Sequence, residues 1–147
     1  MRVYIDTSVF GGYFEPEFEV WTRPFFKSIR KNVISPIVSE LTVNELEEAP
    51  DRVRHLFKEH IPKIKIVQLG DEVYHLANLY IKEKAVTPKS YDDAVHIAVA
   101  TIIKADVIVS WNFKHIVNVN RIRSYNSANL KYGYSVIDIR TPLEFIS

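Results

Sequence analysis

The sequence predicts an α/β protein built on a central, mainly parallel sheet. Short apolar strands alternate along the 147-residue chain with longer segments of helical periodicity, the pattern of parallel strands joined by crossover helices. Asp6 closes the apolar strand at residues 2–6, and Ser110 follows the apolar run at 107–109. Ligands of parallel sheets gather at the carboxyl ends of the strands. The fold class therefore indicates where a site would lie.

Turn and cap signals divide the chain into elements. Gly11-Gly12 interrupts the segment after the first strand, and Ser35-Pro36 fits a helix N-cap followed by proline at the first helical position. Pro62 ends a helix, and Ser90 caps a later one. We expect strands at about 2–6, 33–34, 64–67, 107–109 and 135–139, and helices at about 16–31, 36–48, 51–60, 71–84, 90–104 and 119–130.

Composition sets broad limits on the function. The length and the 47% of hydrophobic residues suit one domain over residues 1–147 with a sizeable core. The chain has no cysteine, which excludes a disulfide framework, a cysteine zinc site and a thiol nucleophile. It has no apolar run as long as a membrane span, about 20 residues. We expect a cytoplasmic, soluble protein without a membrane partner.

The charge is unevenly distributed although the formal net charge is only +1. Residues 111–137 contain no Asp or Glu and four cations, Lys114, Arg121, Arg123 and Lys131. This segment either binds a phosphate backbone or is a solvated helix face with a chance asymmetry. Trp111, at its start, either stacks on an unpaired base or lies in the core or a dimer contact.

Three acidic residues occupy positions where apolar residues are expected: Asp6, Glu45 and Asp93. A carboxylate near a core loses hydration, at a cost of several kcal/mol unless a cation or hydrogen bonds replace it. Three such placements suggest a shared cation. Carboxylates suit Mg²⁺ or Mn²⁺, which can activate water for phosphodiester cleavage.

Each of these acids also has a structural explanation. Glu45 falls in the apolar stripe of its expected helix, but it could reach water from the open end of that stripe. Asp93 fits a capping box with Ser90 and would favour the helix dipole. Asp6 could serve a turn. His96, one turn after Asp93, is more typical of a hydrogen-bonded core residue than of a metal ligand.

The chain resembles the PIN-domain nucleases, and within them the VapC-like toxin ribonucleases. The resemblance lies in Tyr4-Ile5-Asp6-Thr7-Ser8, Glu45, Asp93-Ala94-Val95-His96-Ile97-Ala98 and Val107-Ile108-Val109-Ser110-Trp111-Asn112. It implies a PIN-like α/β/α sandwich with acids that coordinate Mg²⁺ or Mn²⁺. It also implies hydrolysis of single-stranded or structured RNA by a homodimer that a cognate antitoxin silences.

The resemblance assigns roles to individual residues. Asp6, Glu45 and Asp93 match the catalytic, metal-binding acids, and Ser8 and Ser110 match supporting hydroxyls. Asn112 stands where many members have a fourth acid, so a second metal is in doubt. The RNA backbone would be guided by Lys114, Arg121 and Arg123.

Other functions fit less well. A haloacid-dehalogenase-like phosphatase needs a second Asp two residues after Asp6, where this chain has Ser8. A response-regulator receiver needs an Asp after its third strand, and residues 64–69 end without one. The remaining alternative to a ribonuclease is a catalytically weak or inactive PIN-fold module that binds RNA or a protein partner.

Overall fold

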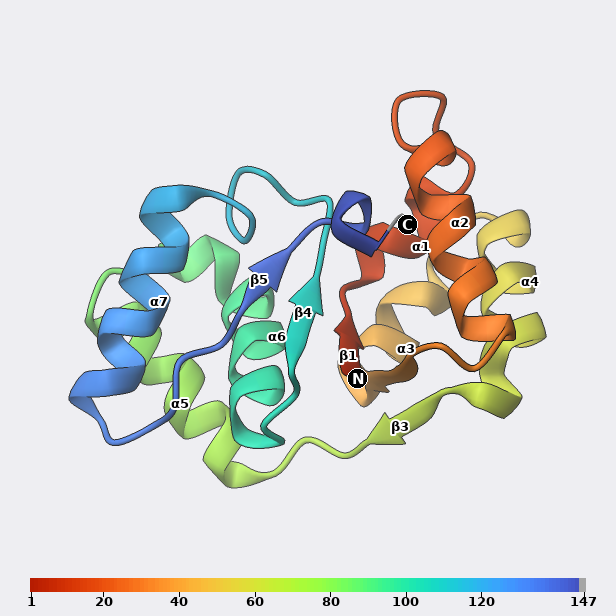
Figure 1. The fold of residues 1–147 in the computed structure, drawn as a ribbon. Helices are drawn as coiled ribbons and strands as arrows, with labels where there is room; N and C mark the ends of the chain where they lie inside the picture. Colours follow the sequence, from red (N-terminus) through yellow and green to blue (C-terminus); the bar gives the residue numbers. More distant parts are fainter. Residues whose placement is uncertain (146–147) are drawn as a thin grey trace.

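The computed structural model describes residues 1–145 and contains a five-stranded, all-parallel sheet in the order β3-β2-β1-β4-β5 (Figure 1). Short 3-10 turns lie at Ile61–Lys63, Pro88–Ser90 and Pro142–Phe145. In chain order the elements are β1 (Arg2–Ile5), α1 (Thr7–Gly12), α2 (Glu19–Arg30), β2 (Ser35–Ser39), α3 (Glu40–Glu47), α4 (Asp51–His60), β3 (Lys65–Val67), α5 (Asp71–Lys82), α6 (Tyr91–Ile102), β4 (Val107–Val109), α7 (Val119–Lys131) and β5 (Ile139–Arg140). The predicted α/β class with a parallel sheet is confirmed.

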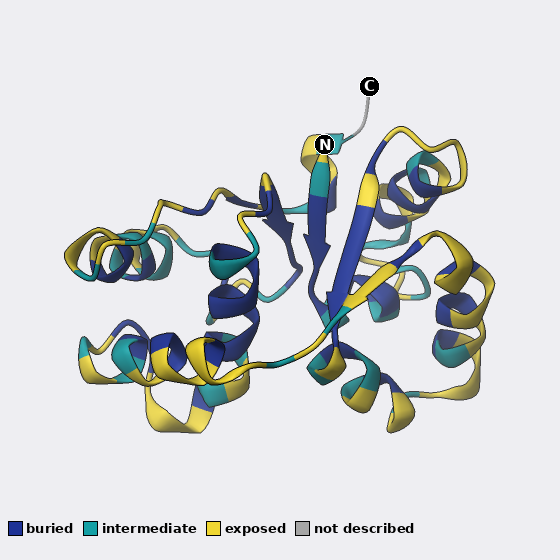
Figure 2. Ribbon diagram, turned by 90° about the horizontal axis from the view of Figure 1, so that it is seen from below, coloured by how far each residue is buried: buried dark blue, intermediate teal, exposed yellow. Residues whose placement is uncertain are grey.

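The sheet separates two apolar cores, with α1 to α4 on one side and α5 to α7 on the other (Figures 1 and 2). Successive strand side chains point to opposite faces, so each of the central strands β1, β2 and β4 contributes to both cores. Tyr4, Ile37 and Ile108 pack with the α5–α7 side. Val3, Ile5 and Val109 pack with the α1–α4 side. Because both faces of the sheet are covered at its centre, β1 and β4 read as continuous apolar runs rather than as alternating ones.

Strand β1 lies at the centre of the sheet and pairs with β2 on one side and β4 on the other. The chain leaves β1 toward β2 and later returns to the opposite side to form β4. Ligands of open parallel sheets bind at such a reversal of strand order, at the carboxyl ends of the strands. Asp6 and Ser110 are the first residues beyond β1 and β4.

The helix expected at 36–48 is wrong in its first part, because Ser35–Ser39 form β2 and α3 begins at Glu40. The amide of Ser35 donates to the Met1 carbonyl on the β1 side. The nitrogen of Pro36 therefore faces the β3 side, where pairing begins only at Ile37. Proline loses no ladder hydrogen bond there, so the N-cap interpretation fails. The strand expected at 33–34 is likewise wrong, because these residues form a bend before β2.

Gly11 and Gly12 do not break the chain but form the end of the short helix α1, and α2 begins at Glu19 rather than at residue 16. A Cβ on Gly12 would lie 2.6 Å from Cδ1 of Trp111, so this glycine permits close approach rather than a turn. The other expected elements agree with the structure within about three residues, except that β5 begins at Ile139. No helix within residues 1–145 is long and apolar enough to cross a membrane.

Candidate active site

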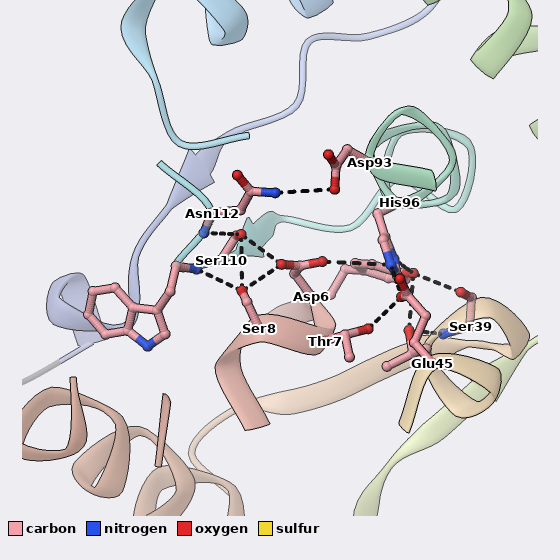
Figure 3. A network of polar contacts seen from close by, with 12 residues as sticks. Asp6, Thr7, Ser8, Ser39, Glu45, Asp93, His96, Ser110 and Asn112 are labelled. Atoms are coloured by element: carbon pink, nitrogen blue, oxygen red, sulfur yellow. Dashed lines mark hydrogen bonds and ion pairs between the residues drawn. The ribbon is translucent and has the colours of Figure 1, made fainter. Parts of the chain in front are cut away.

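The candidate site lies at the carboxyl ends of the central strands β1 and β4 (Figure 3). The amide of Asp6 donates to the carbonyl of Val109 at 3.0 Å, which joins the two strand ends. Asp6 keeps an extended backbone and continues the alternation of β1, so its side chain lies on the same side as Tyr4, toward α6. Glu45 comes from α3 and Asp93 from the first turn of α6. Four separate elements thus converge here.

Asp6 is buried and held by two hydroxyl groups. Its Oδ2 accepts hydrogen bonds from Ser8 Oγ at 2.6 Å and from Ser110 Oγ at 2.8 Å, and its side chain is only 6% exposed. Both serines expected to support the site therefore contact the same oxygen. This fixes the carboxylate and leaves its second oxygen, Oδ1, facing His96 at 3.6 Å.

Glu45 lies half-buried on α3 and accepts two short hydrogen bonds. The apolar stripe expected around Glu45 rested on a helix beginning at residue 36, but residues 36–39 lie in β2, so that part of the derivation does not hold. Glu45 instead shares a helix face with Thr42, one turn earlier and buried. Its Oε1 accepts from Thr7 Oγ1 at 2.7 Å and from His96 Nε2 at 2.6 Å. Burial would raise the pKa of Glu45, but the hydrogen bond and charge of His96, with the bond from Thr7, leave that pKa lowered.

His96 is the residue whose role sequence reasoning missed. It is hydrogen-bonded and 1% exposed, as expected of a core histidine, yet its partners are the site carboxylates. Its Nδ1 lies 2.7 Å from the hydroxyl of Tyr4, which in turn lies 2.8 Å from Ser39 Oγ. Burial would lower the pKa of His96, but Tyr4 and then Glu45 and Asp6 raise it well above its usual value. The signal available in the sequence was that His96 and Asp93 share one helix face.

The negative charge of Asp93 has fewer stabilising partners than that of Glu45. Ser90 lies at the N-cap of α6, but within the described residues its side chain makes no capping hydrogen bond, so the capping-box explanation fails. The Asp93 carboxylate accepts from Asn112 Nδ2 at 3.2 Å. Burial, followed by the charge of Asp6, raises the pKa of Asp93 to about 6, although His96 opposes this rise. Negative charge at Asp93 is therefore less favourable than on a carboxylate in water.

The segment after β4 places Asn112 beside Asp93. The amide of His115 donates to Asn112 Oδ1 at 2.9 Å, which turns the Asn112 NH₂ group toward Asp93. Trp111 is buried, stacks on Phe18 with 4.4 Å between ring centroids, and donates from Nε1 to Thr22. Of the alternatives for Trp111, core packing is confirmed and base stacking is wrong. This packing holds the segment that carries Asn112.

The predicted RNA-binding cations lie around the same segment. Lys114 and Arg123 are exposed, and Arg121 donates from Nη1 to the carbonyl of Ala85 at 2.8 Å. Burial and then the charges of Lys114 and Arg121 lower the pKa of His115. These two cations therefore act on a residue that bonds Asn112, so positive charge adjoins the acidic cluster.

A family model described as PIN domain matches residues 2–114 of the chain. The chain belongs to the PIN-domain family. No curated protein matches the sequence. Two solved structures share this fold. FitAcB from Neisseria gonorrhoeae has a TM-score of 0.61 and 15% sequence identity, and the match covers 95% of this chain and 97% of that chain. VapBC2 from Rickettsia felis, bound to a DNA fragment from their promoter, has a TM-score of 0.60 and 10% sequence identity, and the match covers 96% of this chain and 98% of that chain.

PIN domains are generally nucleases and typically use divalent metal ions. Carboxylate oxygens fit Mg²⁺ or Mn²⁺, and the raised pKa of Asp93 marks negative charge that a cation would offset. Among residues 1–145, however, no three His, Cys, Asp or Glu side chains are grouped so that they could hold one ion. The donor chemistry of the cluster fits a cation, but the side chains do not form a complete ligand set.

Proposed function

We propose that this protein is a metal-dependent endoribonuclease that hydrolyses phosphodiester bonds of single-stranded or structured RNA. The observation that carries the proposal is the convergence of Asp6, fixed by two serine hydroxyls, and Asp93, which accepts from Asn112, at the carboxyl ends of the central strands of a PIN fold. The continuous sheet, which runs beyond the matched residues to β5, supports a single domain over residues 1–147.

In the proposed mechanism Asp6 and Asp93 would hold Mg²⁺ or Mn²⁺, and Glu45 would act as a third acid, directly or through water. The cation, when bound, supplies Lewis-acid activation of the phosphodiester and of the attacking water. Ser8 and Ser110 keep Asp6 oriented by donating to its Oδ2. Hydrolysis adds the water oxygen to phosphorus, breaks a phosphorus–oxygen ester bond and returns a proton to the leaving oxygen.

Substrate binding would rely on the polar and basic residues beside the acids. The NH₂ group of Asn112 faces Asp93 and could donate to a phosphate oxygen. Lys114, Arg121 and Arg123 would contact the RNA backbone, so binding should weaken steeply with salt. Each of these contacts is independent of base identity, and the proposal names no preferred sequence.

We further propose that the protein is the toxin of a toxin–antitoxin pair and acts as a homodimer. The resemblance to VapC-like ribonucleases and the fold shared with FitAcB and VapBC2 support this. Co-expression with the product of an adjacent small reading frame, followed by co-purification and assay, tests the partner. Light scattering of the purified protein tests the dimer.

The second candidate function is a PIN module that binds RNA or a protein without cutting. Asn112 in place of a fourth acid favours it, as does the engagement of Glu45 by His96. Cleavage of a mixed-sequence single-stranded RNA in Mn²⁺, Mg²⁺ or EDTA separates the two functions. We expect cutting with metal only, and its loss in Asp6→Asn but not in Asp71→Asn, a change of an exposed acid on α5. Wild-type protein that binds RNA yet stays inert with both metals would establish the module instead.

A further inference from the structure

Phe113 is half exposed at the edge of the candidate site. Its exposed fraction of 50% is larger than those of the other two exposed aromatic residues in the described part of the chain, Trp21 at 38% and Tyr74 at 40%. It directly follows Asn112, whose Nδ2 lies 3.2 Å from Asp93 Oδ1. A single exposed apolar side chain is common on protein surfaces, so exposure alone assigns no role to Phe113. The role follows from the rings and charges around it.

Phe113 forms the outer end of a row of three aromatic rings, Phe18, Trp111 and Phe113. Phe18 and Trp111 stack on each other, with 4.4 Å between ring centroids and 20° between ring planes. Phe113 lies 6.2 Å from Phe18 and 6.1 Å from Trp111, and its ring is tilted to theirs by 38° and 52°. Neither inner ring therefore covers Phe113 as Phe18 covers Trp111, and half of Phe113 stays open to a ligand.

Hydrogen bonds hold the loop between β4 and α7, which carries Phe113 (Figure 1). The amide of Phe113 donates to the carbonyl of Trp111 at 3.0 Å, and the carbonyl of Phe113 accepts from Asn118 Nδ2 at 3.4 Å. The amide of Ile116, whose side chain is fully buried, donates to the carbonyl of Asn112 at 3.1 Å. The ring is thus presented in a fixed place, and a ligand that packs on it does not have to order the loop.

The charges on either side of the row indicate the chemistry of that ligand. Lys114 follows Phe113 and is exposed, and residues 111–137 contain no Asp or Glu. At the inner end of the row, the loop before α2 exposes Glu15 and Glu17. A ligand with a flat apolar part and a negative charge would place the flat part on Phe113 and the charge toward Lys114, away from these acids. An unpaired nucleotide has both parts, because its base has a π face and its phosphate is an anion.

We propose that Phe113 is a base-stacking residue, whose ring packs against an unpaired base of the RNA substrate while Lys114 contacts the adjoining phosphate. The inference rests on the proposed ribonuclease function and adds a contact that requires exposed bases. Bases in a duplex are stacked on one another and cannot lie on the ring, so this contact selects single strands. Phe113 takes the role that the buried Trp111 cannot fill. The base that it holds lies near the phosphate at Asn112, because consecutive Cα atoms are only about 3.8 Å apart.

The test compares two strands of equal length and charge, a uridine oligoribonucleotide and the same backbone without bases. Fluorescence anisotropy measures both dissociation constants in EDTA, where the proposed cleavage does not proceed. We expect wild-type protein to bind the uridine strand about tenfold more tightly than the baseless strand, as for stacking of one base. Phe113→Ala should lose this preference, while its affinity for the baseless strand stays within about twofold of wild type.

Further variants separate stacking from other roles. Phe113→Tyr keeps a π face and should keep the preference, whereas Phe113→Leu keeps apolar packing without an aromatic face and should lose it. Lys114→Ala should weaken binding of both strands alike and reduce the slope of log affinity against log salt by about 0.7. Tyr74→Ala, which removes an aromatic residue of similar exposure on α5, should change neither quantity.

Two results with folded Phe113 variants would overturn the inference. Equal loss of affinity for both strands would show that the side chain only supports the loop. An unchanged preference for the uridine strand in both Phe113→Ala and Phe113→Leu would show that no base packs on the ring, and that its exposed face serves a protein contact or none. Urea unfolding of each variant establishes that it is folded.

The stacking inference and the ribonuclease proposal can fail separately. Loss of the base preference in Phe113→Ala, without RNA cleavage by wild type in Mn²⁺ or Mg²⁺, would refute the ribonuclease and leave Phe113 as an RNA-binding residue. RNA cleavage by a wild-type protein that binds both strands equally would refute the stacking inference alone. Wild-type protein that binds neither strand at low salt would also overturn the stacking inference.

Discussion

The two carboxylates that helices bring to the site differ sharply in how the protein accommodates them. Glu45 on α3 accepts short hydrogen bonds from Thr7 and His96, and its pKa is lowered. Asp93 on α6 accepts a longer bond from the amide of Asn112, and its pKa is raised to about 6. The fold stabilises the negative charge of Glu45 and opposes that of Asp93. A bound cation should therefore matter most to Asp93.

The largest expected difference between the two acids is in catalysis. Asp93→Asn should reduce Mn²⁺-dependent RNA cleavage by more than about 100-fold, because it removes one of the two acids proposed to hold the cation. Glu45→Gln should reduce it by about tenfold or less, as expected for a residue that acts through others. Initial rates on a fluorescent single-stranded RNA measure both.

Asp92→Asn is the matched control for this comparison. Asp92 precedes Asp93 on the first turn of α6 and is exposed, so its replacement, which removes a neighbouring charge but none of the site's hydrogen bonds, should leave the rate within about twofold. If Glu45→Gln and Asp93→Asn lose activity equally, the proposed difference between the two acids is wrong.

Asn112, the donor to Asp93, also depends on the packing around Trp111. Gly12→Ala would place a Cβ 2.6 Å from Trp111, displacing the segment that holds Asn112, and should cost about 2 kcal/mol of unfolding free energy. Urea denaturation measures this. Gly11→Ala is the control, because its Cβ would meet only Glu15 Oε1 at 3.4 Å, and it should be neutral or stabilising.

Double-mutant cycles of unfolding free energy test the link between Trp111 and Asn112. The stability effects of Gly12→Ala and Asn112→Ala should be non-additive, because Trp111 and Asn112 are neighbours in one segment. Those of Gly12→Ala and Thr87→Val, a change at an exposed residue outside α1, should add within about 0.5 kcal/mol. Additivity of the first pair would show that Trp111 does not position Asn112.

The two acids should have opposite effects on the pH dependence of stability in EDTA. Asp93 titrates near 3.8 when unfolded and near 6 when folded. Asp93 therefore contributes stability to the folded protein that is fully present below about pH 4, where its carboxyl group is protonated. This contribution is lost as the pH rises through 6. The pKa of Glu45 is lowered by folding, so its contribution is present above about pH 4.5, its unfolded value, and is lost as the pH falls.

Melting temperatures of the variants test these signs. Asp93→Asn should melt several degrees higher than wild type at pH 7.5 and gain less at pH 4.5. The stabilisation in unfolding free energy should be about 1–2 kcal/mol larger at pH 7.5 than at pH 4.5, once solvent screening is allowed for. Glu45→Gln should instead lose stability at pH 7.5. A difference between Asp93→Asn and wild type that does not vary with pH would show that burial does not oppose the charge of Asp93.

The contrast between the acids also shows what could be predicted from the sequence. The parallel sheet followed from apolar strand runs, and the contact of Ser8 with Asp6 joins residues two apart. The link from Glu45 to His96 joins residues 51 apart on different helices. Spacing within one helix cannot reveal such a link, because it depends on how α3 and α6 meet across the end of β1.

Pro36 illustrates the other limit of local signals. Ser35-Pro36 has the residue preferences of a helix start, but Ile37 and Val38 are buried in the sheet between β1 and β3. Burial against two neighbouring strands outweighs a cap, which contributes only about 1 kcal/mol. The same pairing places Ser39 at the end of β2, where it contacts Tyr4 behind His96.

The smallest expected effect concerns the second donor to Glu45. Thr7→Val keeps the shape of the side chain but removes the hydroxyl that donates to Oε1 at 2.7 Å. We expect a loss of about 1 kcal/mol of unfolding free energy at pH 7.5, with Mn²⁺ affinity nearly unchanged because His96 still holds Glu45. Thr87→Val, outside the site, is the control. A large fall in Mn²⁺ affinity in Thr7→Val would mean that Glu45 contacts the ion directly, and the two acids would then have the same role.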